Sequence, residues 1–370
     1  MIVGIPRETQ ENERRVAATP RTVRKLKERG YTVLVEQLAG EGSHFDDYSY
    51  LKAGAKLVSA DNAFAADIVF KVNKPVSDEI KKMKPGASLV CLVDACTSAD
   101  VCRQLADAQI DTFALERIPR ISRAQSMDVL SSQSNIAGYR AALTAANLYS
   151  SFLPMMMTSA GVAKPAKVLI LGAGVAGLQA IATVRKLGAR VYAYDVRPEV
   201  KEQIGSLGAT FIEIPLDEEG RGQGGYAREL SEEAQARQQE KLGEIMKSMN
   251  IIISTALIPC QRAPVLITED VVRGMEKGSV IVDLAASGGG NCALTKPGTT
   301  VIQYGVTIYG ETNLPSQMAT DASAFYSQNL INFLSVMIDE TVGKLAKKDY
   351  FADEITSASL VTHNGEVRAL

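Results

Sequence analysis

The chain has 370 residues, of which 46% are apolar, and its formal net charge is −2. This length and apolar content suffice for two domains of ordinary size, and the near balance of charge excludes nucleic acid as an expected partner, because a phosphate backbone calls for a basic face. No run approaches 18 apolar residues, the N-terminus lacks the features of a secretory signal, and the five cysteines show no CxxC spacing, so we expect no direct membrane span, no leader and no bound metal.

Short apolar runs alternate with helical patterns in the first third of the chain. Strands are predicted at 2–5, 32–36, 68–72, 88–93 and 112–115, and helices at 20–29 and 98–108. Such alternation is typical of a parallel sheet with helices on its faces. No glycine fingerprint occurs in this region, so we expect no nucleotide site there.

A long alanine-rich helix is predicted at 131–152, and it is suitable for crossing between two domains. A second helical stretch at 321–347 is expected to pack back on the first domain. The fold class is therefore α/β, with two Rossmann-like domains built on parallel sheets, long linking helices and a cofactor cleft between the domains. The expected boundaries are 1–135 together with 310–370 for the discontinuous first domain, 136–163 for the linker, and 164–309 for the second domain.

The most specific signal lies between residues 167 and 195, in the sequence KVLILGAGVAGLQAIATVRKLGARVYAYD. An apolar run leads into a G-x-G-x-x-G turn, a helical pattern and a second apolar run, as in a dinucleotide-binding unit. Gly172 allows the tight turn, Gly174 lets backbone amides approach a pyrophosphate, and Gly177 allows close packing of helix on strand. The helix N-terminus, with Val175 and Ala176, offers N–H groups to the phosphates.

Asp195 ends the second apolar run, where a carboxylate accepts hydrogen bonds from an adenosine ribose. It favours NAD over NADP, since a 2′-phosphate would meet a like charge. Val196 and Arg197 follow directly, and an arginine there can either accommodate that phosphate, lie over the adenine or face solvent. Thr255, Ala256 and Leu257 close a later predicted strand at the same edge and are also expected to contact the cofactor.

Two further segments leave alternatives open. Residues 215–229 carry several glycines and one aromatic ring, Tyr226, which suggests either a mobile flap or a solvated surface loop. Residues 288–291 are either a second backbone approach to the cofactor or only a loop.

Several motifs resemble one family over nearly the whole chain. They are GIPRE near the start, PRISRAQSMDVLSSQSNIAGYRAA at 119–142, the glycine fingerprint, DVRPEVKEQ, GGYARE, TALIPCQRAPVLIT, and GSVIVDLAASGGGNC at 278–292. The chain is similar to the NAD(H)-binding component of proton-translocating nicotinamide nucleotide transhydrogenase. The GIPxE start and the fingerprint are shared with a relative, alanine dehydrogenase.

The resemblance implies a component that binds NAD(H) and passes hydride between NADH and NADP⁺ on an NADP(H)-binding partner component. A membrane component would couple this step to proton translocation. The chain would then be cytoplasmic, held peripherally at the inner membrane through its partners, and a homodimer. The sequence itself offers only a mostly apolar helical region around 330–338 as an interface signal.

The family's loop near the nicotinamide maps onto Arg120, Gln125, Asp128 and Ser131, and its mobile-loop tyrosine maps onto Tyr226. Arg120 and Asp128 are a cation and an anion that can pair, while Gln125 and Ser131 suit a carboxamide and a ribose. Spacing alone indicates only a polar helix N-terminus with Ser126 as its cap.

Alanine dehydrogenase is the main alternative function, and its deamination needs a lysine and a histidine beside the nicotinamide. The expected histidine is absent from Leu92–Asp94, and Asn73 stands where the lysine is expected, although Lys71 or Lys74 could substitute. Arg15, which holds the substrate carboxylate in that relative, is present. Hydride transfer between two nicotinamides needs no general base, so the sequence favours transhydrogenation. A non-catalytic NAD-binding protein is the third possibility.

Overall fold

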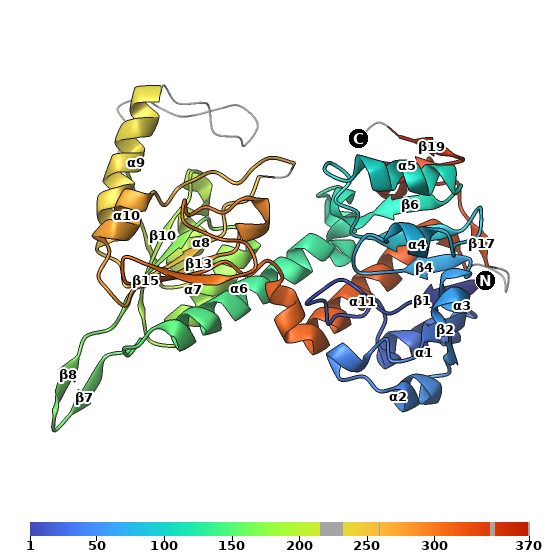
Figure 1. The fold of residues 1–370 in the computed structure, drawn as a ribbon, viewed down its shortest axis with the longest axis horizontal. Coiled ribbons are helices and arrows are strands. Elements are labelled where there is room, and N and C mark those ends of the chain that lie inside the picture. The colour runs from blue at the N-terminus through green and yellow to red at the C-terminus, as the bar shows by residue number, and fades with distance from the viewer. Residues whose placement is uncertain (215–231, 259, 341–344, 369–370) are drawn as a thin grey trace. The chain divides into compact units, whose positions relative to one another are not determined.

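The computed structural model describes residues 1–214, 232–258, 260–340 and 345–368, which form two compact α/β units (Figure 1). The first unit combines Met1–Gln133 with Pro315–Leu370, and the second consists of Ser134–Leu314. The chain therefore leaves the first unit and returns to it, so that the C-terminal segment completes a domain begun by the N-terminal one.

The first unit is built on a sheet that has eight strands among the described residues. Their order is β19 (Glu366–Val367), β18 (Leu360–His363), β6 (Asp111–Ala114), β5 (Ser88–Cys91), β4 (Ile68–Phe70), β1 (Ile2–Ile5), β2 (Thr32–Glu36) and β3 (Lys56–Val58). From β3 to β6 all neighbours are parallel, as predicted, whereas β18 and β19 extend the sheet antiparallel.

Helices cover both faces of this sheet, because alternate strand residues belong to different cores. In β4, Ile68 and Phe70 belong to a core that includes Leu330 and Phe333 of α11, whereas Val69 belongs to a core that includes Leu105 of α5. The helices of the unit are α1 (Pro20–Glu28), α2 (Asp47–Lys52), α3 (Ala60–Phe64), α4 (Ser77–Ile80), α5 (Ala99–Asp107), α11 (Ala319–Met337) and α12 (Glu354–Ser359).

Helix α11 differs from the prediction at its C-terminal end. It stops at Met337 rather than 347, and Ile338–Asp339 (β16) then pairs antiparallel with Ala346–Lys347 (β17). Beyond Ile338 the sequence offers few apolar side chains with which to continue a buried helix face. The apolar residues around 330–338 are not an interface signal either, since Leu330, Phe333, Leu334 and Met337 are 0% exposed within the first unit's own core.

The second unit holds a sheet with seven described strands. Their order is β11 (Thr210–Phe211), β10 (Arg190–Tyr194), β9 (Lys167–Leu171), β12 (Ile251–Ser254), β13 (Val280–Asp283), β15 (Val306–Tyr309) and β14 (Thr300–Gln303). All neighbours are parallel except β14 with β15. The strand order reverses between β9 and β12, and ligands of open α/β sheets bind at the carboxyl ends of the strands at such a point.

Helices also cover both faces of the second sheet. Val168 and Ile170 of β9 belong to a core with Ala141 and Ala145 of α6, while the alternate Leu169 belongs to a core with residues of α9. The helices of the unit are α6 (Val129–Leu148, which begins in the first unit), α7 (Val175–Lys186), α8 (Lys201–Ser206), α9 (Glu232–Lys247) and α10 (Glu269–Gly274). A two-stranded hairpin of β7 (Met156–Thr158) and β8 (Gly161–Ala163) projects from this unit (Figure 1).

Candidate functional site

The glycine fingerprint forms the turn between β9 and α7, and each glycine meets a different requirement. Gly172 has a φ of +93°, which a residue with a side chain rarely adopts. A Cβ at Gly177 would lie 1.9 Å from the carbonyl oxygen of Gly172, so that position must be glycine for the helix to approach the strand. A Cβ at Gly174 would meet nothing within 4 Å, which leaves the backbone of the turn accessible to a ligand.

Helix α7 begins at Val175, and Gly174 precedes it as a residue that provides no side-chain cap. The first N–H groups of a helix lack intrahelical partners and carry a partial positive charge, so an uncapped N-terminus of this kind suits an anion. Val175 is 42% exposed and Val196, one residue beyond Asp195, is 61% exposed. These apolar side chains flank the turn at the carboxyl edge of the sheet.

Asp195 follows β10, and its side chain is only 6% exposed. Its Oδ2 accepts a hydrogen bond of 2.7 Å from the N–H of Ala173, and its Oδ1 accepts one of 2.9 Å from the N–H of Arg197. The Arg197 guanidinium adds bonds of 2.9 Å from Nε and 3.0 Å from a terminal nitrogen. Burial alone would raise the pKa of Asp195, but these hydrogen bonds outweigh it and the pKa lies below its usual value. The carboxylate is therefore ionised and ties the glycine turn to the end of β10.

The end of β12 reaches the same turn through Thr255. Its hydroxyl donates to the carbonyl oxygens of Leu171 at 3.2 Å and Gly172 at 3.0 Å. Ala256 comes next and is held by Asn291, which accepts from the Ala256 N–H at 3.0 Å and donates to its carbonyl oxygen at 2.8 Å. Leu257, which is 54% exposed, follows directly.

The 288–291 loop therefore has a structural role, because the buried Asn291 side chain holds the segment that follows β12 through hydrogen bonds to its backbone. Sequence reasoning did not assign Asn291 this role, because its partners are more than 25 residues away.

Gly138 on α6 is a second residue that sequence reasoning missed. A Cβ there would lie 2.1 Å from the carbonyl oxygen of Ala176, in the first turn of α7. The glycine thus permits α6 to lie against the helix whose N-terminus forms the site. A glycine inside an alanine-rich helix was the available signal, since such a position usually has a packing reason.

In the first unit, the segment expected near the nicotinamide runs through a 3-10 helix, Ser122–Met127, into α6. Asp128 caps α6: its Oδ1 accepts from the Ser131 N–H at 2.9 Å, and its Oδ2 accepts from the Ser131 hydroxyl at 2.5 Å. The predicted cap, Ser126, is wrong, because the 3-10 turn places it before the helix start. Arg120 is exposed and makes no hydrogen bond or ion pair with any described residue, so the suggested Arg120–Asp128 pair is absent.

Helix α11 holds this segment on both sides of Asp128. Asn329 donates to the Ser126 carbonyl oxygen at 2.8 Å and accepts from the Ser132 hydroxyl at 2.7 Å, and Asn332 adds a bond of 2.9 Å to Ser126. Gln125 lies beside Ser126 and is exposed. Tyr226, the remaining residue proposed for this chemistry, lies outside the described residues.

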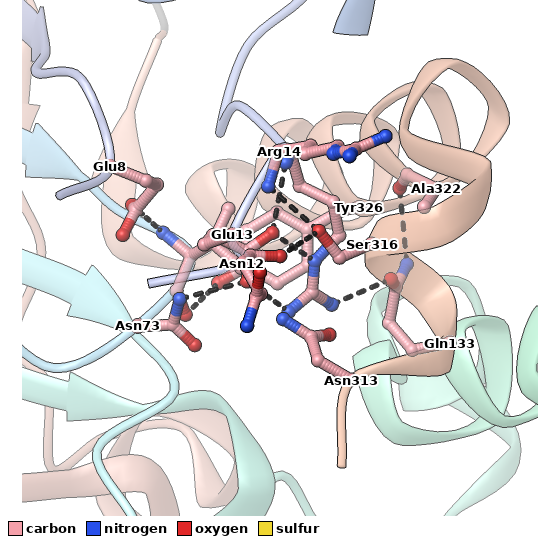
Figure 2. Close-up of polar contacts among 12 residues, drawn as sticks. Glu8, Asn12, Glu13, Arg14, Asn73, Gln133, Asn313, Ser316, Ala322 and Tyr326 are labelled. Atoms are coloured by element: carbon pink, nitrogen blue, oxygen red, sulfur yellow. Dashed lines mark hydrogen bonds and ion pairs between the residues drawn. The ribbon is translucent and has the colours of Figure 1, made fainter. Parts of the chain in front are cut away.

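A buried polar cluster joins four segments of the first unit that lie far apart in the sequence (Figure 2). The Arg15 guanidinium donates to both carboxylate oxygens of Glu13 at 2.9 and 2.7 Å, and to Oε1 of Gln133 at 2.9 Å. Asn73 donates to Glu13 at 2.9 Å, and Gln133 donates to the Ala322 carbonyl oxygen of α11 at 3.1 Å. Arg15 is thus paired with a carboxylate and an amide side chain of its own chain.

The first sheet also has a reversal of strand order, between β1 and β4. Side chains fill this point: Glu8 accepts from the Val72 N–H at 2.6 Å and pairs with Lys71 at 3.3 Å. Lys71 is 1% exposed and also pairs with Glu79 at 3.3 Å. The position at which the second unit has an open glycine turn is therefore occupied here by a buried ion cluster.

The lysine and histidine residues that could serve an amino-acid dehydrogenase make other contacts in this structure. Lys71 is enclosed by two carboxylates, and Lys74 bonds the Ser98 hydroxyl at 2.7 Å. His363 bonds Asp111 on β6 at 2.8 Å. Within the described ranges no cluster of His, Cys, Asp and Glu could hold a metal ion, and no helix combines the length and hydropathy that a bilayer crossing requires.

Comparison with known proteins shows the family. Models of the alanine dehydrogenase/PNT N-terminal and C-terminal domains match residues 4–137 and 141–369. The chain is 46% identical to an NAD(P) transhydrogenase alpha subunit chain of Rhodospirillum rubrum, over 99% of this chain and 97% of that protein.

Two solved structures show the same fold over the whole chain. A crystal structure of transhydrogenase from Sinorhizobium meliloti matches with a TM-score of 0.86 and 42% identity, covering 99% of this chain and 98% of the other. An L-alanine dehydrogenase matches with a TM-score of 0.84 but only 25% identity, covering 99% and 96%. The expected pair of Rossmann-like domains and the resemblance to transhydrogenase are confirmed, and the chain belongs to the alanine dehydrogenase/PNT family, among its NAD(P) transhydrogenase alpha subunits.

Proposed function

We propose that the second unit binds NAD(H) and that the chain passes hydride between NADH and NADP⁺ held on a separate NADP(H)-binding component. The observation that carries this proposal is the open glycine turn at the reversal point of the second sheet, tied to the buried carboxylate of Asp195. The turn and the N-terminus of α7 suit a pyrophosphate, and the acid at the end of β10 suits a ribose diol. Val175, Val196 and Leu257 are the exposed apolar side chains that would line the cofactor.

The chemistry of the 120–131 segment supports hydride transfer between nicotinamides over deamination. Such a transfer moves no substrate proton, so it requires aligned rings and exclusion of water rather than a general base. Gln125 and Ser131 offer amide and hydroxyl groups, and Asp128 orients Ser131. Arg120 is free to contact a ligand, and Tyr226 is proposed as the ring of a loop that closes over the nucleotide.

Amino-acid oxidation is the less favoured candidate for a specific reason. The Arg15 charge is already compensated by the Glu13 carboxylate, and its guanidinium is also held by Gln133, so a substrate carboxylate would compete with an existing ion pair. Lys71 would have to leave two acids before it could act on a substrate. Removing one partner of a buried ion pair is costly, typically about 3–5 kcal/mol. The cluster therefore supports a structural rather than a substrate-binding role for Arg15.

A membrane component that couples hydride transfer to proton translocation completes the proposed assembly, with this chain held peripherally at the cytoplasmic face through its partners.

We also propose a homodimer. This proposal rests on the resemblance to the transhydrogenase family. The exposed apolar side chains of the β7–β8 hairpin, Met156 and Met157 at 38% and 73% and Val162 at 64%, are the candidate contact surface. Sedimentation of wild type and Met157→Asp at micromolar concentration tests this, and a monomeric wild type would rule it out.

Reconstitution tests the function itself. The chain would be assayed for reduction of an NADP⁺ analogue by NADH, alone and with the NADP(H)-binding component, beside an assay with alanine and pyruvate. We expect little turnover by the chain alone and rapid turnover with the partner. Robust alanine oxidation by the chain alone would support the dehydrogenase alternative, and NADH binding without turnover under either condition would support a non-catalytic NAD-binding protein.

A further inference from the structure

The carboxylate of Asp195 is fully engaged by donors from its own chain. Oδ1 accepts from the Arg197 N–H and from Nε of the same residue, both at 2.9 Å, while Oδ2 accepts from the Ala173 N–H at 2.7 Å and from the terminal guanidinium nitrogen at 3.0 Å. An ionised carboxylate offers about four lone-pair sites. Four donors therefore occupy the group that the ribose of NAD(H) is proposed to use.

These four donors differ in how easily they can leave. The N–H groups of Ala173 and Arg197 are fixed by the glycine turn and by the chain after β10. The Arg197 guanidinium is carried on a flexible side chain that is 42% exposed, and it bonds no described residue other than Asp195. A ribose diol that needs two acceptor sites can obtain them only by displacing this guanidinium.

We propose that Arg197 competes with the adenosine ribose of NAD(H) for Asp195 and thereby sets the discrimination between NADH and NADPH. This inference rests on the proposed NAD(H) site of the second unit. Each NADH that binds must first break a bidentate guanidinium–carboxylate pair, which lowers its affinity. A partly exposed pair of this kind accounts for about a two- to fivefold effect on an equilibrium.

The same side chain has the opposite effect on NADPH. Once displaced, its guanidinium lies close to the 2′ position and can pair with a 2′-phosphate, for which its planar fork is well suited. Without Arg197, that phosphate would face an uncompensated carboxylate. Loss of the arginine is therefore expected to shift the two affinities in opposite directions, which a general destabilisation of the site would not do.

Arg197→Met tests this, because methionine keeps an unbranched apolar stem but cannot pair with Asp195. The control is Arg190→Met, since Arg190 is an exposed arginine at the first residue of β10, at the end of the strand far from Asp195. Titration calorimetry of the full chain at fixed ionic strength would give the Kd for NADH and for NADPH, with thermal unfolding as a check on folding.

We expect Arg197→Met to bind NADH about two- to fivefold more tightly and NADPH at least about fivefold more weakly, with Arg190→Met unchanged. The NADH gain should shrink at high salt, because screening already weakens the exposed pair in the wild type. NADH affinity that falls or stays the same in a folded Arg197→Met would overturn the competition, and NADPH affinity that stays the same would overturn the phosphate role. A different result would show that the proposed NAD(H) site itself is wrong: Gly174→Val would then bind NADH with full affinity.

Discussion

The carboxylate of Glu13 and the guanidinium of Arg15 form an ion pair of 2.7 Å whose side chains are 0% and 6% exposed. Two residues of one short segment thus neutralise each other inside the first unit. Asn73 and Gln133 complete their hydrogen bonds from two other segments. The pair therefore fixes the start of α6, where the Asp128–Ser131 motif lies, against the segment after β1.

This pair predicts a specific response to acid. Burial alone would raise the pKa of Glu13, but hydrogen bonds and charge from Arg15 and the hydrogen bond from Asn73 lower it from 4.5 to about 2. Because the folded-state pKa is the lower one, the stabilisation is complete above about pH 4.5 and is lost as the pH falls towards 2. It is expected to amount to roughly 3 kcal/mol across that window.

Glu13→Gln should lack this pH-dependent stabilisation, so its free energy of unfolding should fall less steeply than that of wild type as the pH falls from 4.5 towards 2. It should also be less stable at neutral pH by about 3–5 kcal/mol, because Arg15 remains buried without its acid. Urea unfolding at a series of pH values measures both effects, with the exposed Glu11→Gln as control. Parallel pH profiles for wild type and Glu13→Gln would contradict the assignment.

Gly174→Val should separate folding from nucleotide binding. A Cβ at this position meets nothing within 4 Å in the free chain, so the melting temperature should change little. The new side chain would occupy the space through which a pyrophosphate approaches the turn, so NADH affinity should fall at least about tenfold, or 1.4 kcal/mol. Gly205→Val, also in open space but on α8, is the matched control and should bind normally. Normal binding by Gly174→Val would show that the phosphates lie elsewhere.

Asp195→Ala should weaken NADH binding by about 1–3 kcal/mol, the range for charge-assisted hydrogen bonds. It should also narrow the preference for NADH over NADPH, because the like charge that opposes a 2′-phosphate is removed. Parallel titrations with the two nucleotides measure this. If both affinities match those of wild type, Asp195 does not accept the ribose hydroxyls.

Gln125→Asn should slow hydride transfer more than it weakens NADH binding. The shorter side chain keeps the amide but withdraws it by one methylene, and a displacement near 1 Å can cost on the order of 100-fold in rate through geometry alone. Stopped-flow transfer to the NADP⁺ analogue with the partner component present, at saturating NADH, gives the rate, and calorimetry gives the Kd. Tyr226→Phe should behave in the same way if its loop closes over the nucleotide. Full-speed transfer in both variants would remove these residues from the site.

Asn329 should act on the same step without contacting the nucleotide. Asn329→Asp replaces one donor to the Ser126 carbonyl oxygen by an acceptor while retaining an acceptor for Ser132, so the segment around Asp128 loses one of the three hydrogen bonds that hold it to α11, and only Asn332 still donates to Ser126. We expect turnover to fall about tenfold with NADH affinity nearly unchanged, since a misplaced ring affects rate more than binding. Asn62→Asp, on the exposed face of α3, is the control. An equal loss of rate and NADH affinity would indicate a general structural role instead.

Features encoded in one continuous stretch could be predicted from the sequence. The glycine turn, α7 and Asp195 lie within 29 residues. The two strands on either side of α7, β9 and β10, appear in the structure with nearly the predicted bounds. Likewise β1 and β2 have the predicted bounds, because a short apolar run between polar or turn residues indicates a buried strand locally.

Only the tertiary structure decided the features that depend on distant partners. The apolar stretch around 330–338 could equally have been a surface, and it is a core helix because the first sheet covers it. Asp128 rather than Ser126 caps α6, since α11 binds the Ser126 carbonyl oxygen and holds the preceding turn in place. Arg15 and Asp195 could be identified as charged residues, but their partners follow from chain packing: charges that leave water must find compensation nearby, and which groups are near is a property of the folded chain.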